Sequence, residues 1–254
     1  MILSPVKTRI LFPPKDDLVG AIQEALPHLE EKTILAVSSK VVSIWQGRCV
    51  LQEEALDKDA LIKEEAEWYL PRETLPKKWV MHTLKNNLLV PTAGIDESNG
   101  NGYYILWPKE SKRAARMLYH KLKRLYGIKN FGIVIADSHT IPLRRGTIGI
   151  SLGHYGFGAL RDYRGTKDLF GRTFAVTQAN TVDSIAAAAV LIMGEGNEST
   201  PLALIYDVPF IAFGTKAEKG KEHFGSFEVK PEEDLYAPLF LKAAWRKGGG
   251  GIRS

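Results

Sequence analysis

Apolar residues recur along the chain at two spacings, one typical of helices and one typical of strands. The helical pattern predicts four helices, at residues 18–26, 57–70, 112–127 and 181–193. Acidic residues stand at the start of the first and the last of these, and a glycine follows the last at the position of a C-terminal cap. Runs of β-branched and apolar residues predict strands at residues 33–44, 131–138, 147–153, 174–178, 200–208 and 209–214.

The segment 79–95 is predicted to be a β-hairpin, since Asn86 and Asn87 near its middle tolerate the positive φ values of a tight turn. Strands alternate with helices, but the hairpins argue against a purely parallel sheet. We therefore predict an α+β fold with mixed, largely antiparallel sheets and flanking helices. Residues 1–245 are expected to form one unit, or two interleaved subdomains, and the glycine-rich end at 246–254 a disordered tail.

The composition of the 254-residue chain is that of a globular protein, with 44% hydrophobic and 25% charged residues. Its single cysteine, Cys49, can form no internal disulfide and has no partner at zinc-ligand spacing. The longest apolar run, 185–193, is about half of the roughly 20 residues that a membrane span needs. The first residues lack the cleavage site of a signal peptide. We expect a cytoplasmic protein that contacts no membrane.

The net charge of +5 is compatible with anionic ligands but falls far short of a nucleic-acid-binding signature, so no nucleic acid partner is expected. Basic residues concentrate in the predicted helix at 112–127, mostly opposite its apolar stripe. Two interpretations stay open for them, a solvated helix face or a surface that attracts phosphate.

Carboxylates stand beside glycine or other small residues in three segments, 91–102, 135–146 and 191–200. The chain has no GxxxxGK[ST], GxGxxG or HExxH motif, so P-loop, Rossmann and zincin sites lack their key residues. Carboxylates with adjacent hydroxyls and amides are the hard oxygen ligands that Mg²⁺ or Mn²⁺ takes when it also holds phosphates. The candidate metal ligands are Asp96, Asp137 and Ser138.

These candidates also have structural interpretations. Asp96 could form a turn or cap a helix. Asp137 follows an apolar strand, where a half-buried carboxylate needs a cation or N–H donors, and Arg144 or Arg145 could pair with it. The same two arginines, in a loop bounded by proline and glycine, could instead clamp a planar anion. His139 is either a loop residue or a base.

The segment LRDYRGTKDLFGR, at 160–172, packs six charged residues into one polar run. A solvated loop is the default interpretation of such a run. Its regular interleaving with glycine and phenylalanine favours instead a fixed turn network, which would orient the arginines or bridge two subunits.

Several motifs occur together and in a characteristic order. They are VSSKVVSIWQGR, AGIDESN, IADS followed by P-x-R-x-G-x-x-G, LRDYRGTKDLFGR, and FAVTQANTVDSIAAAAVLIMGEG. In these motifs, over residues 9–213, the chain resembles the CofE family, the γ-glutamyl ligases that elongate the deazaflavin coenzyme F420.

The resemblance implies an intertwined homodimer with a CofE-like α+β fold. It also implies an enzyme that uses GTP, or ATP, and Mn²⁺ or Mg²⁺ to join L-glutamate to the carboxylate of an acceptor. The metal ligands that it implies are Asp96, Asp137 and Ser138, with Glu195 as a further ligand. The residues that it implies at the nucleotide are Arg9, Ile10, Leu11, Phe12, Ser39, Lys40, Asn99, Gly194 and Gly196. Arg144 or Arg145 would then stabilise charge on the transferred phosphoryl group.

The chain departs from the family's motifs at two places. The family's lysine in SKAEG is Ile44 here, so a charge facing the nucleotide is missing, and the usual aromatic segment after the xDS step is replaced by 139–144. The acceptor therefore stays open between F420-0, a folate and a glutamate-terminated molecule such as a protein tail. A non-catalytic nucleotide-binding homologue is the remaining alternative, and the joint presence of Asp96, Asn99, Asp137 and Ser138 argues against it.

Overall fold

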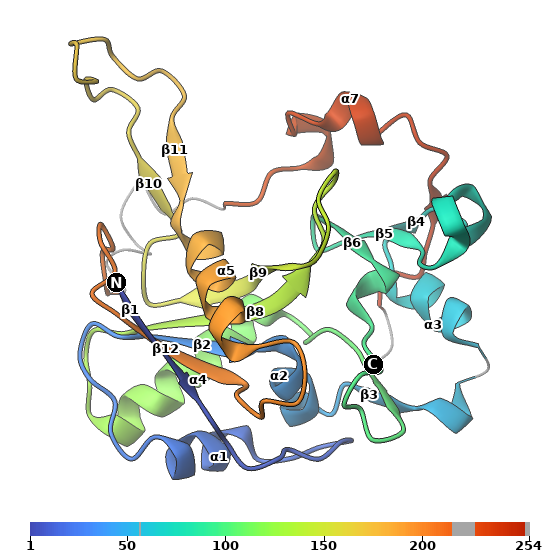
Figure 1. The fold of residues 1–254 in the computed structure, drawn as a ribbon, viewed down its shortest axis with the longest axis horizontal. Coiled ribbons are helices and arrows are strands. Elements are labelled where there is room, and N and C mark those ends of the chain that lie inside the picture. Colours follow the sequence, from blue (N-terminus) through green and yellow to red (C-terminus); the bar gives the residue numbers. More distant parts are fainter. Residues whose placement is uncertain (56, 215–226, 252–254) are drawn as a thin grey trace.

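A mixed five-stranded sheet forms the centre of the molecule, in the order β1-β12-β2-β8-β9 (Figure 1). The computed structural model describes residues 1–55, 57–214 and 227–251. Strands β2 and β8 are parallel, and the other neighbours in this sheet are antiparallel. The predicted α+β class with largely antiparallel sheets is confirmed. The strands are β1 (Ile2–Val6), β2 (Ile34–Ser38), β8 (Gly132–His139), β9 (Ile148–Tyr155) and β12 (Leu202–Tyr206).

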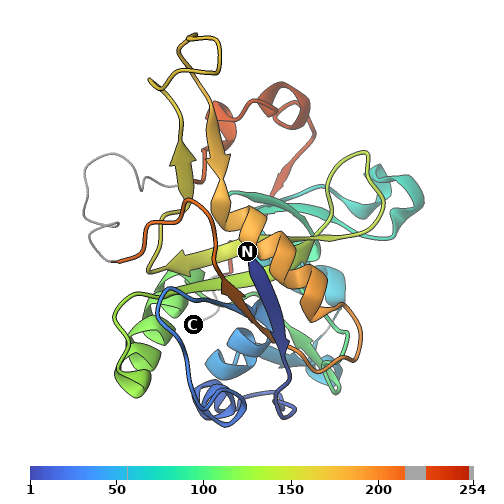
Figure 2. The same ribbon diagram turned by 60° about the vertical axis from the view of Figure 1, so that its left-hand side comes forward.

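Helices cover both faces of this sheet (Figures 1 and 2). The side chains of β2 alternate between the two layers, as the pleat of a strand requires. Ile34 and Ala36 pack in the cluster that contains α5, whereas Leu35 and Val37 pack in the cluster that contains the other three helices. Burial on both faces explains why the four residues before Ser38 are all apolar. The helices are α1 (Leu18–Ala25), α2 (Ser39–Gln46), α4 (Ser111–Tyr126) and α5 (Thr181–Met193).

A four-stranded antiparallel sheet of order β13-β4-β5-β6 lies to one side of the central sheet (Figure 1). Its hairpin turns at Asn86 and Asn87, which have φ values of 52° and 58°, so the predicted hairpin is confirmed. The elements of this region are β3 (Cys49–Leu51), α3 (Lys58–Glu65), β4 (Trp68–Tyr69), β5 (His82–Lys85), β6 (Leu88–Pro91), β7 (Tyr103–Ile105), α7 (Ala237–Phe240) and β13 (Arg246–Lys247). Short 3₁₀ turns lie at Gln52–Glu54, Arg72–Thr74, Pro76–Lys78, Thr92–Gly94 and Pro231–Glu233.

The polar run at 160–172 belongs to an arm that projects from the body (Figures 1 and 2). Strands β10 (Leu160–Asp162) and β11 (Gln178–Asn180) form its base. Asp168 accepts hydrogen bonds from the N–H groups of Phe170 and Arg172, both at 2.8 Å. The run is therefore the fixed turn network that its spacing favoured.

Two predicted elements end earlier than expected. The strand expected at 33–44 ends at Ser38, and helix α2 follows at once. Its β-branched residues are compatible with a helix because they bury one face, including Val41 and Val42. The helix expected at 57–70 stops at Glu65, since the next residues pair as β4.

Two predicted strands also shift. In place of a strand at 174–178, the pairing falls at Gln178–Asn180. The segment expected as a strand at 209–214 contributes only an isolated bridge between Phe213 and Phe157.

The glycine-rich end differs from the disordered tail predicted for 246–254. Arg246 and Lys247 pair with β4, and the N–H groups of the four following glycines donate to carbonyl groups at 63–67. Glycine permits this approach, because a Cβ at Gly248 would lie 2.2 Å from the carbonyl oxygen of Ala66. Residues 252–254 lie outside the described residues. No helix of the described residues is long and apolar enough to cross a membrane.

Close packing of α5 on β9 depends on Gly149, where a Cβ would lie 2.2 Å from the carbonyl oxygen of Ala186. Replacing Gly149 with alanine is expected to lower the free energy of unfolding by about 1–3 kcal/mol, because helix and strand must move apart. Chemical denaturation measures this. In the matched control Gly196→Ala the new Cβ meets only the Glu198 carboxylate, at 3.4 Å. Equal stability of the two variants would contradict the tight contact.

Candidate active site

A cavity of about 680 Å³ opens at one edge of the central sheet. Strand pairing explains which residues meet there. Val6 at the end of β1 pairs with Leu202 at the start of β12, which pairs with Val37, and the next residue of β2 pairs with Ala136 of β8. The segments that leave β1, β2 and β8, and the one that enters β12, therefore gather at the same edge. Some residues of 8–13, 38–44, 136–138 and 190–201 line the cavity, and residues of 96–101 complete the wall.

Asp96 is tied to helix α2 by an ion pair. Its Oδ2 atom lies 2.8 Å from Lys40 Nζ, and its Oδ1 atom accepts a hydrogen bond from the Ser98 N–H at 2.7 Å. Lys40 Nζ also donates to the carbonyl oxygen of Ser98, at 2.8 Å. Burial opposes the charge of Asp96, but the Lys40 and Ser98 contacts outweigh it, and the pKa of Asp96 is lowered. Asp96 is thus a charged carboxylate at the cavity wall.

Asp137 lies near the end of β8, one residue beyond the last pairing with β2. Its Oδ2 atom accepts a short hydrogen bond from Trp107 Nε1, and the Ser39 hydroxyl donates to it as well. Burial, with a smaller contribution from the nearby charge of Asp96, raises the pKa of Asp137 to about 6 against these hydrogen bonds. The two carboxylates are close enough to repel each other.

The loop after α5 closes another side of the cavity. Gly194 ends the helix with a φ of 80°, a conformation that favours glycine. Asn99 Nδ2 donates to the carbonyl oxygen of Gly196 at 2.9 Å, which joins this loop to the 96–101 segment. Glu195 is exposed and accepts a hydrogen bond from the Thr147 hydroxyl at 3.3 Å.

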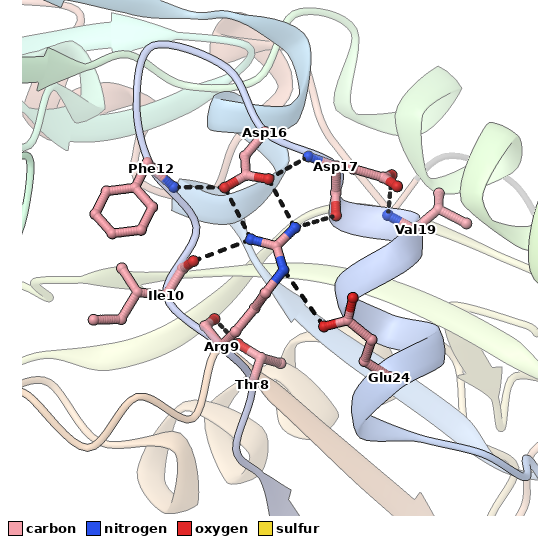
Figure 3. Close-up of polar contacts among 8 residues, drawn as sticks. All are labelled: Thr8, Arg9, Ile10, Phe12, Asp16, Asp17, Val19 and Glu24. Atoms are coloured by element: carbon pink, nitrogen blue, oxygen red, sulfur yellow. Dashed lines mark hydrogen bonds and ion pairs between the residues drawn. The ribbon is translucent and has the colours of Figure 1, made fainter.

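Arg9 lines the cavity, but its guanidinium group is held by carboxylates of the neighbouring segment (Figure 3). Its Nη1 and Nη2 atoms donate to both carboxylate oxygens of Asp16, at 3.0 and 2.8 Å, and its Nε atom lies 3.5 Å from Glu24. Asp16 also accepts from the N–H groups of Phe12 and Asp17, at 2.8 and 2.7 Å. The hydrogen bonds from Arg9 hold the pKa of Asp16 well below its usual range. This network fixes the course of the 8–17 segment.

No group of three or more His, Cys, Asp and Glu side chains converges as a metal site within the described residues. Asp96, Asp137 and Ser138 nevertheless line one cavity and offer the hard oxygen atoms that Mg²⁺ and Mn²⁺ take. A cation between the two carboxylates would favour the ionised form of Asp137, which burial and, to a smaller extent, the charge of Asp96 disfavour. The residues present fit a cation that takes its remaining ligands from phosphate and water.

Comparison with known proteins assigns the chain to a family. The model of the F420-0:gamma-glutamyl ligase family matches residues 6–207. The chain belongs to this family. A protein of Methanopyrus kandleri named Coenzyme F420:L-glutamate ligase is 32% identical over 80% of this chain and 85% of its own. Proteins of the same name from Archaeoglobus fulgidus and Methanococcus maripaludis are 31% and 30% identical, over 84% and 82% of this chain and 90% and 86% of their own.

The cavity brings together most of the residues that the sequence predicted for metal and nucleotide. It is lined by Arg9, Ile10, Leu11, Phe12, Lys40, Asp96, Asn99, Asp137, Ser138, Gly194, Glu195 and Gly196. Ser39 does not line it, because its side chain is buried and faces Asp137. Ligand binding by these residues stays a prediction.

Arg144 and Arg145, the predicted catalytic cations, are not among the residues that line the cavity. They lie in the exposed 140–147 loop between β8 and β9, and Arg144 Nη1 donates to the carbonyl oxygen of Leu143. Among the described residues no ion pair joins either arginine to Asp137, so the structural alternative for that carboxylate is not seen either. Of the two departures from the family motif, Ile44 lines the cavity and is 3% exposed, whereas Leu143 is 97% exposed.

Sequence reasoning missed several residues of the site. Trp107 donates to Asp137 but stands in the apolar run YYILW, where nothing in the pattern separates it from a core residue. Glu198 accepts a hydrogen bond from the Gly196 N–H at 2.8 Å. The GEGNEST stretch offered a signal for Glu198, since it places a second carboxylate in the same loop.

Replacing Asp16 with asparagine is expected to speed hydrogen exchange of the Phe12 amide by about tenfold or more, because an amide presents only one oxygen to Phe12, Asp17 and Arg9. Exchange measured by NMR or mass spectrometry on the folded protein tests this. Asp17→Asn is the matched control, since Asn caps a helix as well as Asp and leaves Asp16 intact. Equal exchange in the two variants would contradict the role of Asp16 in fixing this wall.

Proposed function

We propose that the protein is a nucleotide- and divalent-metal-dependent ligase that adds L-glutamate to the carboxylate of F420-0 or a closely similar acceptor. The observation that carries the proposal is the convergence of Asp96, Asp137 and Ser138 with the glycine loop at 194–196 on one cavity. Family membership supports the ligation, and the names of the relatives support the acceptor.

The reaction needs an activated carboxylate, because a free carboxylate is a poor acyl donor. An acceptor oxygen attacks the γ-phosphorus of GTP, or of ATP, and an acyl phosphate and a nucleoside diphosphate form. The amine of glutamate then attacks the acyl carbon, phosphate leaves with the bonding electrons, and the amine loses a proton. The product is an amide, and each turnover consumes one nucleotide. Charge repulsion between the triphosphate and the acceptor is the first obstacle to this chemistry.

Several features of the cavity suit a triphosphate. Ser38 precedes α2 and makes no side-chain capping bond, so the N-terminal N–H groups of this eight-residue helix are available to phosphate oxygens. Lys40, at the second position of the helix, adds a positive charge at the same place. Gly194 and Gly196 allow the backbone to approach a ligand closely. These groups bind and orient the nucleotide.

Mn²⁺ or Mg²⁺ would neutralise the phosphate charge, and Asp96, Asp137 and Ser138 would hold the ion. Neighbouring residues of the chain keep these ligands in place. Lys40 fixes Asp96 through the 2.8 Å ion pair, and Asn99 ties the segment that carries Asp96 to Gly196. Glu195 also lines the cavity and stays a further candidate ligand.

The remaining elements of the proposal concern the acceptor and the assembly. The segment from His139 to Leu143 leads out of the cavity from Ser138, and we assign it to the acceptor side. The homodimer is supported by the projecting arm, whose tip residues Leu169 and Phe170 are 97% and 95% exposed. A second copy of the chain would remove this apolar surface from water.

Replacing Asp137 with alanine is expected to lower the rate of ligation by about 100-fold or more, because the metal ion that neutralises the phosphate charge would lose a charged oxygen ligand. Mass spectrometry detects the product as glutamyl mass increments on F420-0 incubated with GTP, Mn²⁺ and L-glutamate. A folate and a glutamate-terminated peptide serve as parallel acceptors and are expected to stay unmodified. The matched control is Asp57→Ala, an exposed position away from the cavity. Near-normal turnover by the Asp137 variant would refute the metal role.

Replacing Ile44 with lysine is expected to tighten nucleotide binding by about tenfold, or about 1.4 kcal/mol, because an ammonium group would enter the cavity wall near the phosphates. Isothermal titration with GTP and ATP, with and without Mn²⁺, measures the change. Ile44→Met changes the side chain without adding charge and is the control. Unchanged affinity and selectivity in the lysine variant would show that Ile44 does not face the nucleotide.

A further inference from the structure

Trp107 lies outside the central sheet but contacts the cavity carboxylate of Asp137. It follows β7 and is 2% exposed, and its indole Nε1 atom donates a hydrogen bond to Asp137 Oδ2. An indole N–H can only donate, so its most specific use in a core is to hold one acceptor. Here the acceptor is the carboxylate that the proposed reaction needs.

The backbone around the indole ring is shaped to admit it. Gly94 has a φ of 72°, and a Cβ there would lie 2.2 Å from the indole Nε1 atom. Any other residue at this position would displace the ring and with it the donor. The carbonyl oxygen of Trp107 accepts a hydrogen bond from Arg48 Nε at 3.4 Å, and Lys85 Nζ lies 6.0 Å from the ring centroid.

Arg48 and Lys85 are themselves held by one buried carboxylate. Glu65 is fully buried, and its Oε2 atom accepts from Arg48 Nη2 at 2.7 Å and from Lys85 Nζ at 2.6 Å. Charges taken out of water need such exact pairing, because removing one partner leaves an uncompensated charge in a poorly polarisable environment. The cluster of Glu65, Arg48 and Lys85 therefore resists movement, and it contacts Trp107 through Arg48 at the backbone carbonyl and through Lys85 near the ring.

The chemistry of the donor matters for a carboxylate that must also take a cation. An arginine or lysine on Asp137 would orient it but also compensate its charge, as Lys40 does for Asp96, and so weaken its hold on a metal ion. An indole N–H orients the carboxylate and leaves its charge available. The Ser39 hydroxyl, which also donates to Asp137, is a neutral donor of the same kind.

We propose that Trp107 is a positioning residue, whose indole N–H fixes the Asp137 carboxylate in the orientation that a divalent cation requires, and that the cluster of Glu65, Arg48 and Lys85 fixes Trp107. The cation in this statement rests on the function proposed above. Neutral groups that orient a metal-binding carboxylate typically change metal affinity by about 10-fold to 100-fold when they are removed.

The contact itself is tested without any ligand. The chain has five tryptophans, and each gives one indole N–H signal in a ¹⁵N-labelled sample. The signal lost in Trp107→Phe identifies Trp107. Asp137→Asn is expected to move this signal upfield, because a neutral amide oxygen is a weaker acceptor than a carboxylate. Trp245, whose Nε1 atom donates to the carbonyl oxygen of Phe240 at 2.7 Å, is the internal control and should not move.

The consequence for the cation is tested by binding, with no turnover required. Titration of Mn²⁺ in the presence of GTP, followed by electron paramagnetic resonance of the free ion, is expected to show affinity weakened by about 10-fold or more in Trp107→Phe. Trp245→Phe should match the unmodified protein. A lower affinity in the Trp107 variant only, together with the upfield shift, supports the inference.

The outcomes that overturn the inference are separate from those that overturn the proposed function. The role of Trp107 is overturned if its indole signal does not shift in Asp137→Asn. It is also overturned if Mn²⁺ affinity is unchanged in Trp107→Phe, even when ligation is confirmed. An unmodified protein that binds no Mn²⁺ refutes the proposed function, and the indole signal then decides alone whether Trp107 positions the carboxylate. If Trp107→Phe does not fold, its signal is assigned by elimination from phenylalanine variants of the other four tryptophans, and the Asp137→Asn shift decides.

Discussion

The parallel pairing of β2 with β8 is the constraint on which the site depends. It places Ser38 beside Ala136, so the residues that follow the two strands emerge at the same sheet edge. One strand continues into the helix that carries Lys40, and the other continues to Asp137. An antiparallel pairing of the same two strands would send these groups to opposite ends of the sheet. Antiparallel β12 then brings the glycine loop to this edge by starting where β2 ends.

The two cavity carboxylates, Asp96 and Asp137, are held by different kinds of contact. Asp96 is held by a lysine, which keeps it ionised at the cavity wall, whereas Asp137 is held by neutral donors that leave its charge uncompensated. Arg9 carries a charge at the cavity wall, but its guanidinium group is paired with Asp16. It therefore stabilises the wall rather than a ligand. The cavity wall therefore combines the Lys40–Asp96 ion pair and the start of α2 with Asp137, a carboxylate that has no cationic partner among the described residues. A metal–triphosphate complex carries both signs of charge and matches such a mixed wall.

The sequence predicted the helices and the hairpin well, because those elements follow from local periodicity and turn chemistry. Residue chemistry made Asp96, Asp137 and Ser138 candidate metal ligands, but only the family resemblance placed them in one site, since no local pattern states that distant loops meet. The continuation of β2 as a helix was missed because VVSI has strong strand propensity, and tertiary burial of its residues decides the outcome. Trp107 was missed for a related reason, because a core tryptophan and a donor to a functional carboxylate look alike in a sequence.

The glycine-rich C-terminal segment connects to the site through the same cluster that supports Trp107. The N–H groups of Gly249 and Gly251 donate to the carbonyl oxygens of Lys63 and Glu64, at the end of α3 where Glu65 lies. A Cβ at Gly251 would lie 3.3 Å from Glu65 Oε2, so this segment covers the buried carboxylate directly. It lies beyond the residues 6–207 that match the family. Screening Glu65 from water strengthens its hold on Arg48 and Lys85, because a less polarisable environment enlarges the attraction between opposite charges. The C-terminal segment lies outside the family match, but it thus helps to hold the Trp107 ring against Asp137, which lies within the match.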